Sequence, residues 1–241
     1  MKSFIIIGAG ASGIILAAQL LRRSPDSVVR ILERSGRLGA GIAYATENPS
    51  HLLNVRASNM SAFPDQPDHF VNWLQSSGAA APGHLWEPHS FAPRKLYRIY
   101  LEHLIAPYLS GDDTRLKVEK TGVIDVTLIN GRPTVTTERG DTFTADAVIV
   151  ATGNEAAIGK SGDHVTEYWS SNGYFDVPAN ASVAIFGTGL SMIDSVLSLL
   201  DSGNRSQIYA ISRRGLLPAS HAPAQNFPIE PDDLPVSLGL S

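Results

Sequence analysis

Residues 3–34 read SFIIIGAGASGIILAAQLLRRSPDSVVRILER, and this stretch sets the architecture of the chain. The apolar run at residues 4–7 predicts a short strand, and the apolar run at residues 14–21 predicts a helix. A second strand is expected at residues 28–32, where Val and Ile return. Strand, helix and strand in this order predict a parallel βαβ unit.

The turn between the first strand and the helix reads GAGASG and fits the pattern G-x-G-x-x-G. In such a turn Gly8 permits a tight bend, Gly10 lets the backbone approach a pyrophosphate, and Gly13 allows close helix–strand contact. Ala11 and Ser12 open the helix, and its N-terminal N–H groups carry a partial positive charge that favours phosphate. The turn therefore predicts a dinucleotide site.

An acidic residue, Glu33, ends the second strand twenty positions after Gly13. A carboxylate at this place accepts hydrogen bonds from the hydroxyls of a ribose, and it repels a 2'-phosphate. The first site is therefore expected to accept the ADP half of FAD or NAD and to reject NADP.

A secretory signal is the main alternative for the amino terminus, because Lys2 precedes an apolar run. Three glycines within six positions would weaken the core of a signal, and Arg22 and Arg23 lie on its wrong side. The run is also too short and too rich in glycine for a membrane span. We therefore expect a cytoplasmic protein without a membrane partner.

The composition is that of an ordinary globular protein, with 241 residues, 43% hydrophobic and 17% charged. This length allows one or two domains. The net charge of −4 argues against a nucleic-acid partner, which would need a basic surface. Cysteine is absent from the sequence, which excludes disulfide scaffolds, thiolate metal sites and dithiol redox mechanisms. No metal site is expected.

Two segments after Glu33 are expected to line the ligand. Residues 34–44, which include Gly41, form a glycine-rich loop that we place along the pyrophosphate, although an ordinary surface turn fits the same residues. Residues 51–64 show no clean period and mix polar with apolar side chains, as a ligand-lining loop does. Helices are predicted at residues 68–75 and 94–109.

From residue 116 the apolar period changes from helical to alternating, and Asn130-Gly131 is a strong hairpin signal. We therefore predict an antiparallel meander at about residues 116–146. It is inserted before a buried parallel strand that ends at Thr152 and Gly153. Ligands of open α/β sheets bind at this carboxyl edge, so cofactor contact is favoured there over an ordinary strand end.

Residues 182–214 repeat the opening unit. Gly187 and Gly189 begin a second glycine turn, which continues with Leu190 and Ser191 into an apolar helix. The distance from Gly187 to the end of the next strand is 25 positions, as in the first unit. Met192 replaces the third glycine, which predicts that the packing of helix against strand is looser or reshaped.

The second unit has no acid at the end of its second strand, which reads Ser212-Arg213-Arg214. A hydroxyl and two guanidinium groups suit a 2'-phosphate, since arginine binds phosphate in a bidentate manner. We therefore assign NADPH to this unit and FAD to the first. Two surface arginines after a strand are the simpler alternative.

Several motifs together resemble the FAD-NAD(P)-binding family, which includes FAD-dependent urate hydroxylase and is related to flavin-dependent N-hydroxylating monooxygenases. They are the glycine motif at residues 8–13, GIAY at 41–44, HLLNV at 51–55, A-x-x-MS at 57–61, ATG at 151–153 and SRRG at 212–215. The resemblance implies that FAD is held by Gly8, Gly10, Ser12, Gly13, Glu33 and Arg34, with Asn54 and Met60 toward the flavin. It implies that NADPH is held by Gly187, Gly189, Ser191, Arg213 and Arg214. Our predicted cofactor-binding set also includes Ala11, Gly41, Val123, Thr152, Gly153, Leu190 and Ser212.

The predicted fold is α/β, with a Rossmann-like FAD-binding parallel sheet, an inserted antiparallel β-meander and a second, partial Rossmann-like NADPH-binding unit. We expect an FAD-binding domain at residues 1–153, a linker at 154–181 and the partial unit with its tail at 182–241. Family members are usually longer, and a late strand ending in Gly-Asp is missing here. We therefore expect that the chain is an amino-terminal portion of a larger protein. By itself, this portion is expected to bind the flavin ring weakly.

The leading hypothesis is an FAD-dependent, NADPH-using oxidoreductase of monooxygenase type that acts on a small molecule. No catalytic residue is assigned; His51, His221 and Asn54 are candidates near the reaction zone, and each fits a structural polar role equally well. The absence of cysteine argues against a disulfide reductase mechanism. A non-catalytic FAD/NAD(P)-binding module, an inactive fragment and, less favoured, an NAD-only dehydrogenase stay open. The sequence says nothing about the oligomeric state.

Overall fold

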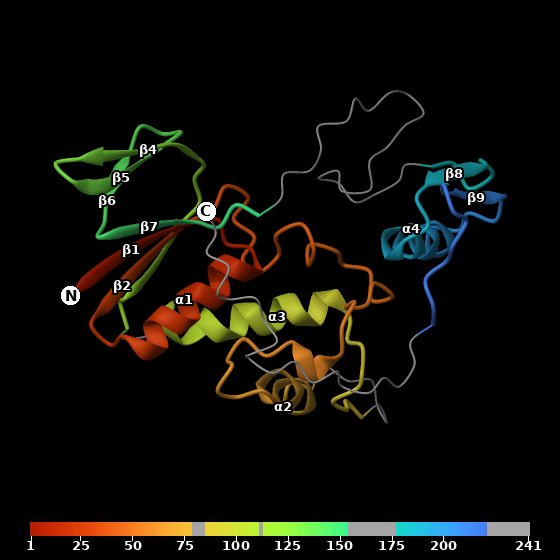
Figure 1. The fold of residues 1–241 in the computed structure, drawn as a ribbon, viewed down its shortest axis with the longest axis horizontal. Helices are drawn as coiled ribbons and strands as arrows, with labels where there is room; N and C mark the ends of the chain where they lie inside the picture. Colours follow the sequence, from red (N-terminus) through yellow and green to blue (C-terminus); the bar gives the residue numbers. More distant parts are fainter. Residues whose placement is uncertain (79–84, 111–112, 154–176, 221–241) are drawn as a thin grey trace, which may run out of the picture.

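The computed structural model describes residues 1–78, 85–110, 113–153 and 177–220. Figure 1 shows two units at opposite ends of the molecule, the first holding β1 to β7 and the second holding β8, α4 and β9. No helix in the described ranges has both the length and the apolar character needed to cross a membrane.

The first unit is built on a four-stranded parallel sheet. Its strand order is β3-β2-β1-β7, so the amino-terminal strand lies at the centre of the sheet. Both faces of a central parallel strand are covered, which explains why its sequence is a continuous apolar run. The four strands are β1 (Lys2–Ile7), β2 (Ser27–Leu32), β3 (Leu116–Glu119) and β7 (Ala147–Val150).

Helices cover one face of this sheet, with α1 (Ala11–Arg23) and α3 (Arg94–Ile105) side by side (Figure 1). Helix α2 (His69–Ser76) packs on α3 through an aromatic cluster in which Phe70 and Tyr100 are fully buried. The helix predicted at residues 94–109 ends as a 3-10 turn, Ala106–Tyr108, because Pro107 cannot continue the hydrogen-bond ladder. A second 3-10 turn spans Ala57–Asn59.

The antiparallel meander covers the other face of the sheet. It consists of β4 (Val123–Ile129), β5 (Arg132–Thr137) and β6 (Thr142–Thr144). Asn130 and Gly131 both have positive φ, 52° and 76°, as the predicted hairpin turn requires. Alternate residues of β1 serve the two faces: Ile6 belongs to the helical core, whereas Ile5 packs with the meander.

The meander begins later than predicted. Residues 116–119, expected as its first strand, form β3, which pairs in parallel with β2 at the edge of the main sheet. A four-residue run with alternating side chains has the same period in either sheet, so its partner is decided by tertiary packing. The antiparallel part therefore spans residues 123–144.

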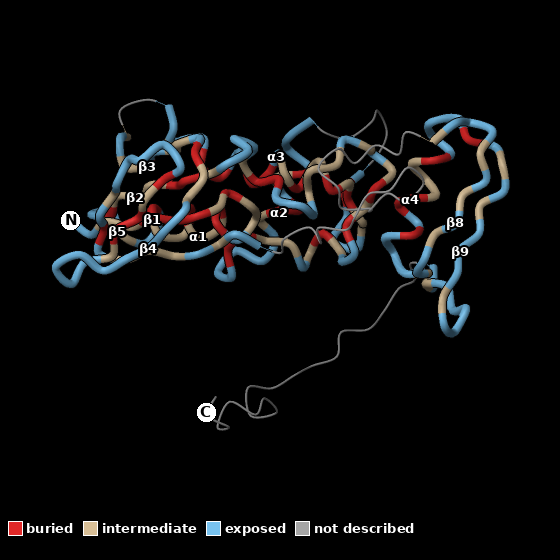
Figure 2. The backbone as a smooth tube through the Cα atoms, turned by 90° about the horizontal axis from the view of Figure 1, so that it is seen from above, coloured by how far each residue is buried: buried red, intermediate tan, exposed pale blue. Residues whose placement is uncertain are grey.

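The second unit repeats the opening βαβ with two strands only. Strand β8 (Val183–Phe186), helix α4 (Leu190–Asp201) and strand β9 (Ile208–Ile211) follow one another, and the strands are parallel. Phe186 pairs with Ile211 just as Ile7 pairs with Leu32, so the predicted repeat is confirmed. Buried residues are concentrated in the first unit, whereas β8 and β9 are largely exposed (Figure 2).

Candidate functional site

The first glycine turn is closed against the strand beside it. Gly8 has φ of +103°, and a Cβ added there would lie 2.5 Å from the backbone oxygen of Ala151. A Cβ on Gly13 would lie 2.1 Å from the oxygen of Gly8. Backbone atoms cannot yield at such distances, so the tight bend and the close helix–strand contact expected of these two glycines are both present.

The start of α1 is open where a pyrophosphate would lie. Gly10 is its N-cap and makes no side-chain capping bond. The glycine-rich loop runs alongside, because the N–H of Gly39 donates to the oxygen of Ala9 at 2.8 Å. The Cα of Gly41 lies 3.5 Å from the Cβ position of Gly10. The loop at residues 34–44 therefore lies against the first glycine turn.

Glu33 fixes the turn with its carboxylate. One oxygen accepts the N–H of Ala9 at 2.7 Å, and the other accepts both the N–H and the hydroxyl of Ser35 at 2.8 Å. A carboxylate has about four acceptor positions, so capacity is left for a ribose hydroxyl. The N–H of Thr121 donates to the backbone oxygen of Glu33, and Val123 begins β4 two residues further on.

The second glycine turn has the same backbone but open surroundings. Gly187 has φ of +111°, and among the residues that the structure describes no heavy atom lies within 4 Å of a Cβ added to Gly187 or Gly189. Ser212 takes the place of Glu33, because its hydroxyl accepts the hydroxyl of Thr188 at 2.8 Å. Arg213 and the following Arg214 are exposed directly after it.

A cavity of about 180 Å³ lies between the two units. It brings together Asn54 and Met60 of the first unit with Leu190 and Ser191 at the start of α4, which are four of the predicted cofactor residues. The remaining lining residues are Ala43, Tyr44, Leu53, Val55 and Arg94. Gly41 lies against the first turn, and Ala43 and Tyr44, which follow it, line this cavity.

The cavity wall contains a buried ion pair that the sequence did not reveal. Arg94 and Asp194 are 2.8 Å apart, and each side chain is only 8% exposed. Burial raises the pKa of the nearby Tyr44 phenol, and the charge of Arg94 opposes this rise. The phenol is therefore a neutral hydrogen-bond donor at physiological pH.

His51, a candidate for the reaction zone, is buried and faces α4. Its Nε2 lies 3.0 Å from the backbone oxygen of Asp194 and 2.9 Å from the hydroxyl of Ser198. A carbonyl only accepts, so Nε2 carries the proton and Nδ1 accepts the hydroxyl of Thr46 at 2.8 Å. This geometry gives His51 a structural partner for each ring nitrogen.

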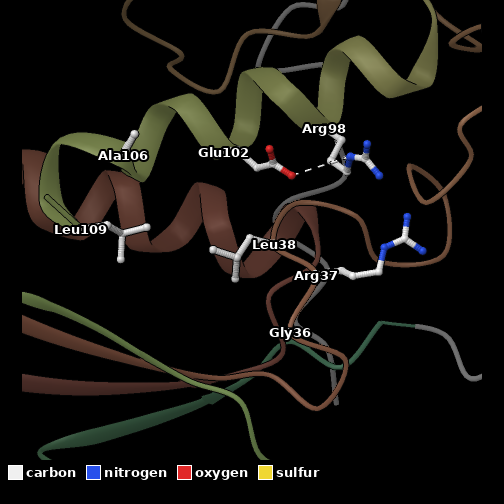
Figure 3. Close-up of a pocket in the computed structure, with 7 residues that line it drawn as sticks. All are labelled: Gly36, Arg37, Leu38, Arg98, Glu102, Ala106 and Leu109. Carbon is white, nitrogen blue, oxygen red and sulfur yellow. Dashed lines mark ion pairs between the residues drawn. The ribbon is translucent and has the colours of Figure 1, made fainter.

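A larger cavity, about 530 Å³, lies between residues 36–38 and α3 (Figure 3). None of the predicted cofactor residues lines it. Its two arginines are engaged by carboxylates: Arg98 lies 2.7 Å from Glu47 and 3.7 Å from Glu102, and Arg37 lies 3.7 Å from Glu47. Arg98, and secondarily Lys95, lower the pKa of Glu47 to about 2. We therefore take the smaller cavity as the candidate site.

The other predicted residues that the structure describes lie near the first glycine turn and Glu33, and they do not line the cavity. Ala11 and Ser12 form the first turn of α1, and Arg34 is exposed beside Glu33. The Cα of Thr152 lies 3.2 Å from the Cβ position of Gly8, at the carboxyl edge of β7, with Gly153 next to it. His221 and residues 154–176 of the predicted linker lie outside the described residues.

Comparison with known proteins identifies a family and a fold. The sequence matches the FAD-NAD(P)-binding family over residues 5–155. No curated protein matches it. Oxidised steroid monooxygenase bound to NADP has a TM-score of 0.58 and 22% identity, and the match covers 86% of this chain and 38% of that one.

Two further solved structures share the fold. For bacillithiol disulfide reductase Bdr (YpdA) from Staphylococcus aureus the TM-score is 0.54 at 22% identity, covering 98% of this chain and 62% of that one. For OTEMO in complex with FAD and NADP the TM-score is 0.56 at 16% identity, and the match covers 86% of this chain and 38% of that one. The chain thus spans between 38% and 62% of the length of these three proteins. The predicted Rossmann-like α/β class is confirmed.

Proposed function

The chain belongs to the FAD-NAD(P)-binding family, and from this premise we propose that it is an FAD-dependent, NADPH-using oxidoreductase of monooxygenase type. The observation that carries the proposal is the cavity between the units. Asn54 and Met60 enter it from the FAD unit, and Leu190 and Ser191 enter it from the second glycine turn. Two redox cofactors bound to the two turns would meet there.

The residues of both turns fit the two nucleotides. Each helix begins at a glycine, Gly10 or Gly189, without a side-chain cap, so the first N–H groups are available to phosphate oxygens. In the first unit we assign the adenosine ribose of FAD to Glu33. In the second we assign the 2'-phosphate of NADPH to the exposed arginines Arg213 and Arg214.

Bound together, FAD and NADPH would supply the chemistry of hydride transfer and of electron transfer to oxygen or another acceptor. The chain's own residues position and shield this exchange. Leu53, Met60 and Leu190 give the cavity apolar walls that limit water. Asn54 and the neutral phenol of Tyr44 offer hydrogen bonds to a ring or a small-molecule substrate.

To test this proposal, the chain is first loaded with FAD and is then mixed with NADPH in the absence of oxygen. We expect the visible flavin absorbance to bleach, faster with NADPH than with NADH, and to return when oxygen is admitted. Retained FAD without bleaching by either nucleotide would contradict the enzyme proposal and support a non-catalytic binding module. Failure to retain FAD, measured by equilibrium dialysis, would contradict the assignment of the first turn.

A further inference from the structure

Helix α4 of the second unit is joined to the first unit by a chain of directional polar contacts. The carboxylate of Asp194 pairs with Arg94 at 2.8 Å. The Nε–H of Arg94 donates to the backbone oxygen of Leu52 at 2.9 Å, and a terminal N–H donates to Oδ1 of Asn54 at 3.2 Å. Arg94 therefore holds both the cavity-lining loop and α4.

Further contacts of the same kind surround this ion pair. The ring of His51 donates to the backbone oxygen of Asp194, one residue of the pair, and also lies within hydrogen-bond distance of Ser198. One turn further on, the side-chain amide of Asn48 donates to Asp201 at 2.8 Å. Residues 48–54 thus follow α4 along its length.

The apolar core of the first unit does not extend into α4. In the described part of the chain, neither of the two apolar clusters of the first unit includes a residue of α4. Apolar contact tolerates sliding because it is non-directional, whereas a buried ion pair with satisfied hydrogen bonds allows few arrangements. We therefore attribute the orientation of α4 to the polar contacts, among which the Arg94–Asp194 pair joins two charged side chains that are each only 8% exposed.

We propose that Arg94 and Asp194 are positioning residues that set the second nucleotide site against the first. Asp194 lies three residues, about one helical turn, after Ser191, so a shift at Asp194 moves the start of α4 as a rigid piece. Arg94 at the same time holds Asn54 on the opposite wall. The role in electron transfer rests on the proposed function, but the geometric role does not.

The geometric role is tested by a distance measurement on the chain without cofactors. The sequence contains no cysteine, so spin labels placed through Asn72→Cys on α2 and Gln207→Cys before β9, both exposed, report only the separation of the two units. We expect one narrow distance distribution in the parent and a shifted or broadened one in D194N and in R94Q. The double variant R94Q/D194N should resemble either single one, since both act through one pair.

The matched control is R132Q, which removes an ion pair of similar length, 2.9 Å to Asp146, within the first unit. It should leave the distance distribution unchanged. A folded D194N chain whose distribution coincides with that of the parent would overturn the proposal. If R94Q does not fold, the comparison of the distance distributions of D194N and R132Q is sufficient to test the proposal.

A kinetic measurement separates positioning from binding. In D194N, flavin reduction by saturating NADPH should slow by about tenfold or more, because small misplacements of reacting groups are costly. The Kd for NADPH, measured by calorimetry on the chain, should change by less than about twofold. Unchanged reduction with a weakened Kd would contradict the positioning role. If the parent itself shows no flavin reduction, the proposed function fails, and the distance measurement still judges the ion pair.

Discussion

The two glycine turns have one backbone design in two different surroundings. Gly8 and Gly187 have nearly the same φ, +103° and +111°, and each donates its N–H to the end of the neighbouring strand, at 2.9 and 2.8 Å. The first turn is enclosed by Ala151 and Thr152, which follow β7, whereas no atom of the described ranges lies within 4 Å of a Cβ added to Gly187. The same motif can therefore be a core element in one unit and a surface in the other.

The difference extends to the third position of the motif. Gly13 brings α1 into contact with the turn, and Met192 stands at the equivalent place in α4. Met192 is buried, only 6% exposed, so this position is enclosed in both units although only the first has a glycine there. The second unit is joined to the first by polar contacts of α4 with Arg94 and His51.

The rims of the two turns differ in charge. Glu33 accepts the N–H of Ala9 with a carboxylate, and Ser212 accepts the hydroxyl of Thr188 with a neutral hydroxyl. The negative charge is thus removed from the second rim while a hydrogen bond to the turn is kept. Arg213 and Arg214 then add positive charge directly after it. This difference in charge is the basis for our proposal of a free ribose in the first unit and a ribose phosphate in the second.

The largest expected effect comes from adding one methyl group to each turn. Gly8→Ala combines positive-φ strain with a 2.5 Å clash against Ala151, so we expect a loss of about 3 kcal/mol or more in unfolding free energy. Gly187→Ala meets the same strain without a clash and should lose about 1–2 kcal/mol. Urea unfolding followed by circular dichroism measures both. Equal losses would show that the second turn is as enclosed as the first.

A smaller effect is expected from removing the positive rim. R213Q/R214Q should raise the apparent Kd for NADPH by about tenfold to a hundredfold, because hydrogen bonds to charged groups contribute about 1.5–3 kcal/mol. NADH lacks the 2'-phosphate, and its Kd should hardly change. Arg23→Gln is the control, since Arg23 is an exposed arginine of the first unit. An equal rise in the Kd for NADPH and for NADH would show that the two arginines contribute only general surface charge.

Local patterns were sufficient to predict most of this fold. The two βαβ units and the hairpin at Asn130 follow from short-range periodicity and turn chemistry, and the structure confirms them. The prediction that residues 116–119 belong to the antiparallel meander was wrong, because alternation does not specify which sheet a strand joins. Strand pairing of that kind depends on residues far away in the sequence.

The ion pair between the units was missed for a related reason. Arg94 and Asp194 are a hundred positions apart, and each resembles an ordinary surface residue of a helix. One signal was present: Asp194 is a lone acid within an otherwise apolar or hydroxyl-bearing stretch of α4, between Met192 and Val196. A buried carboxylate requires a partner, so such a residue predicts a cation somewhere in the chain without saying which.

The smallest expected effect is the acid sensitivity of the segment that leads toward the second unit. Glu47 stands next to Asn48 and binds Arg98 and Lys95 of α3, and these partners lower its pKa from 4.5 to about 2. A depressed folded-state pKa stabilises the fold above the unfolded value, so this contribution is present above about pH 4.5 and is lost as pH falls toward 2. Because the side chain is 56% exposed, we expect less than about 1 kcal/mol. Unfolding free energies of the parent and of Glu47→Gln, measured from pH 6 to pH 3, should converge as the pH is lowered. A constant difference across that range would show that Glu47 acts through packing and not through its charge.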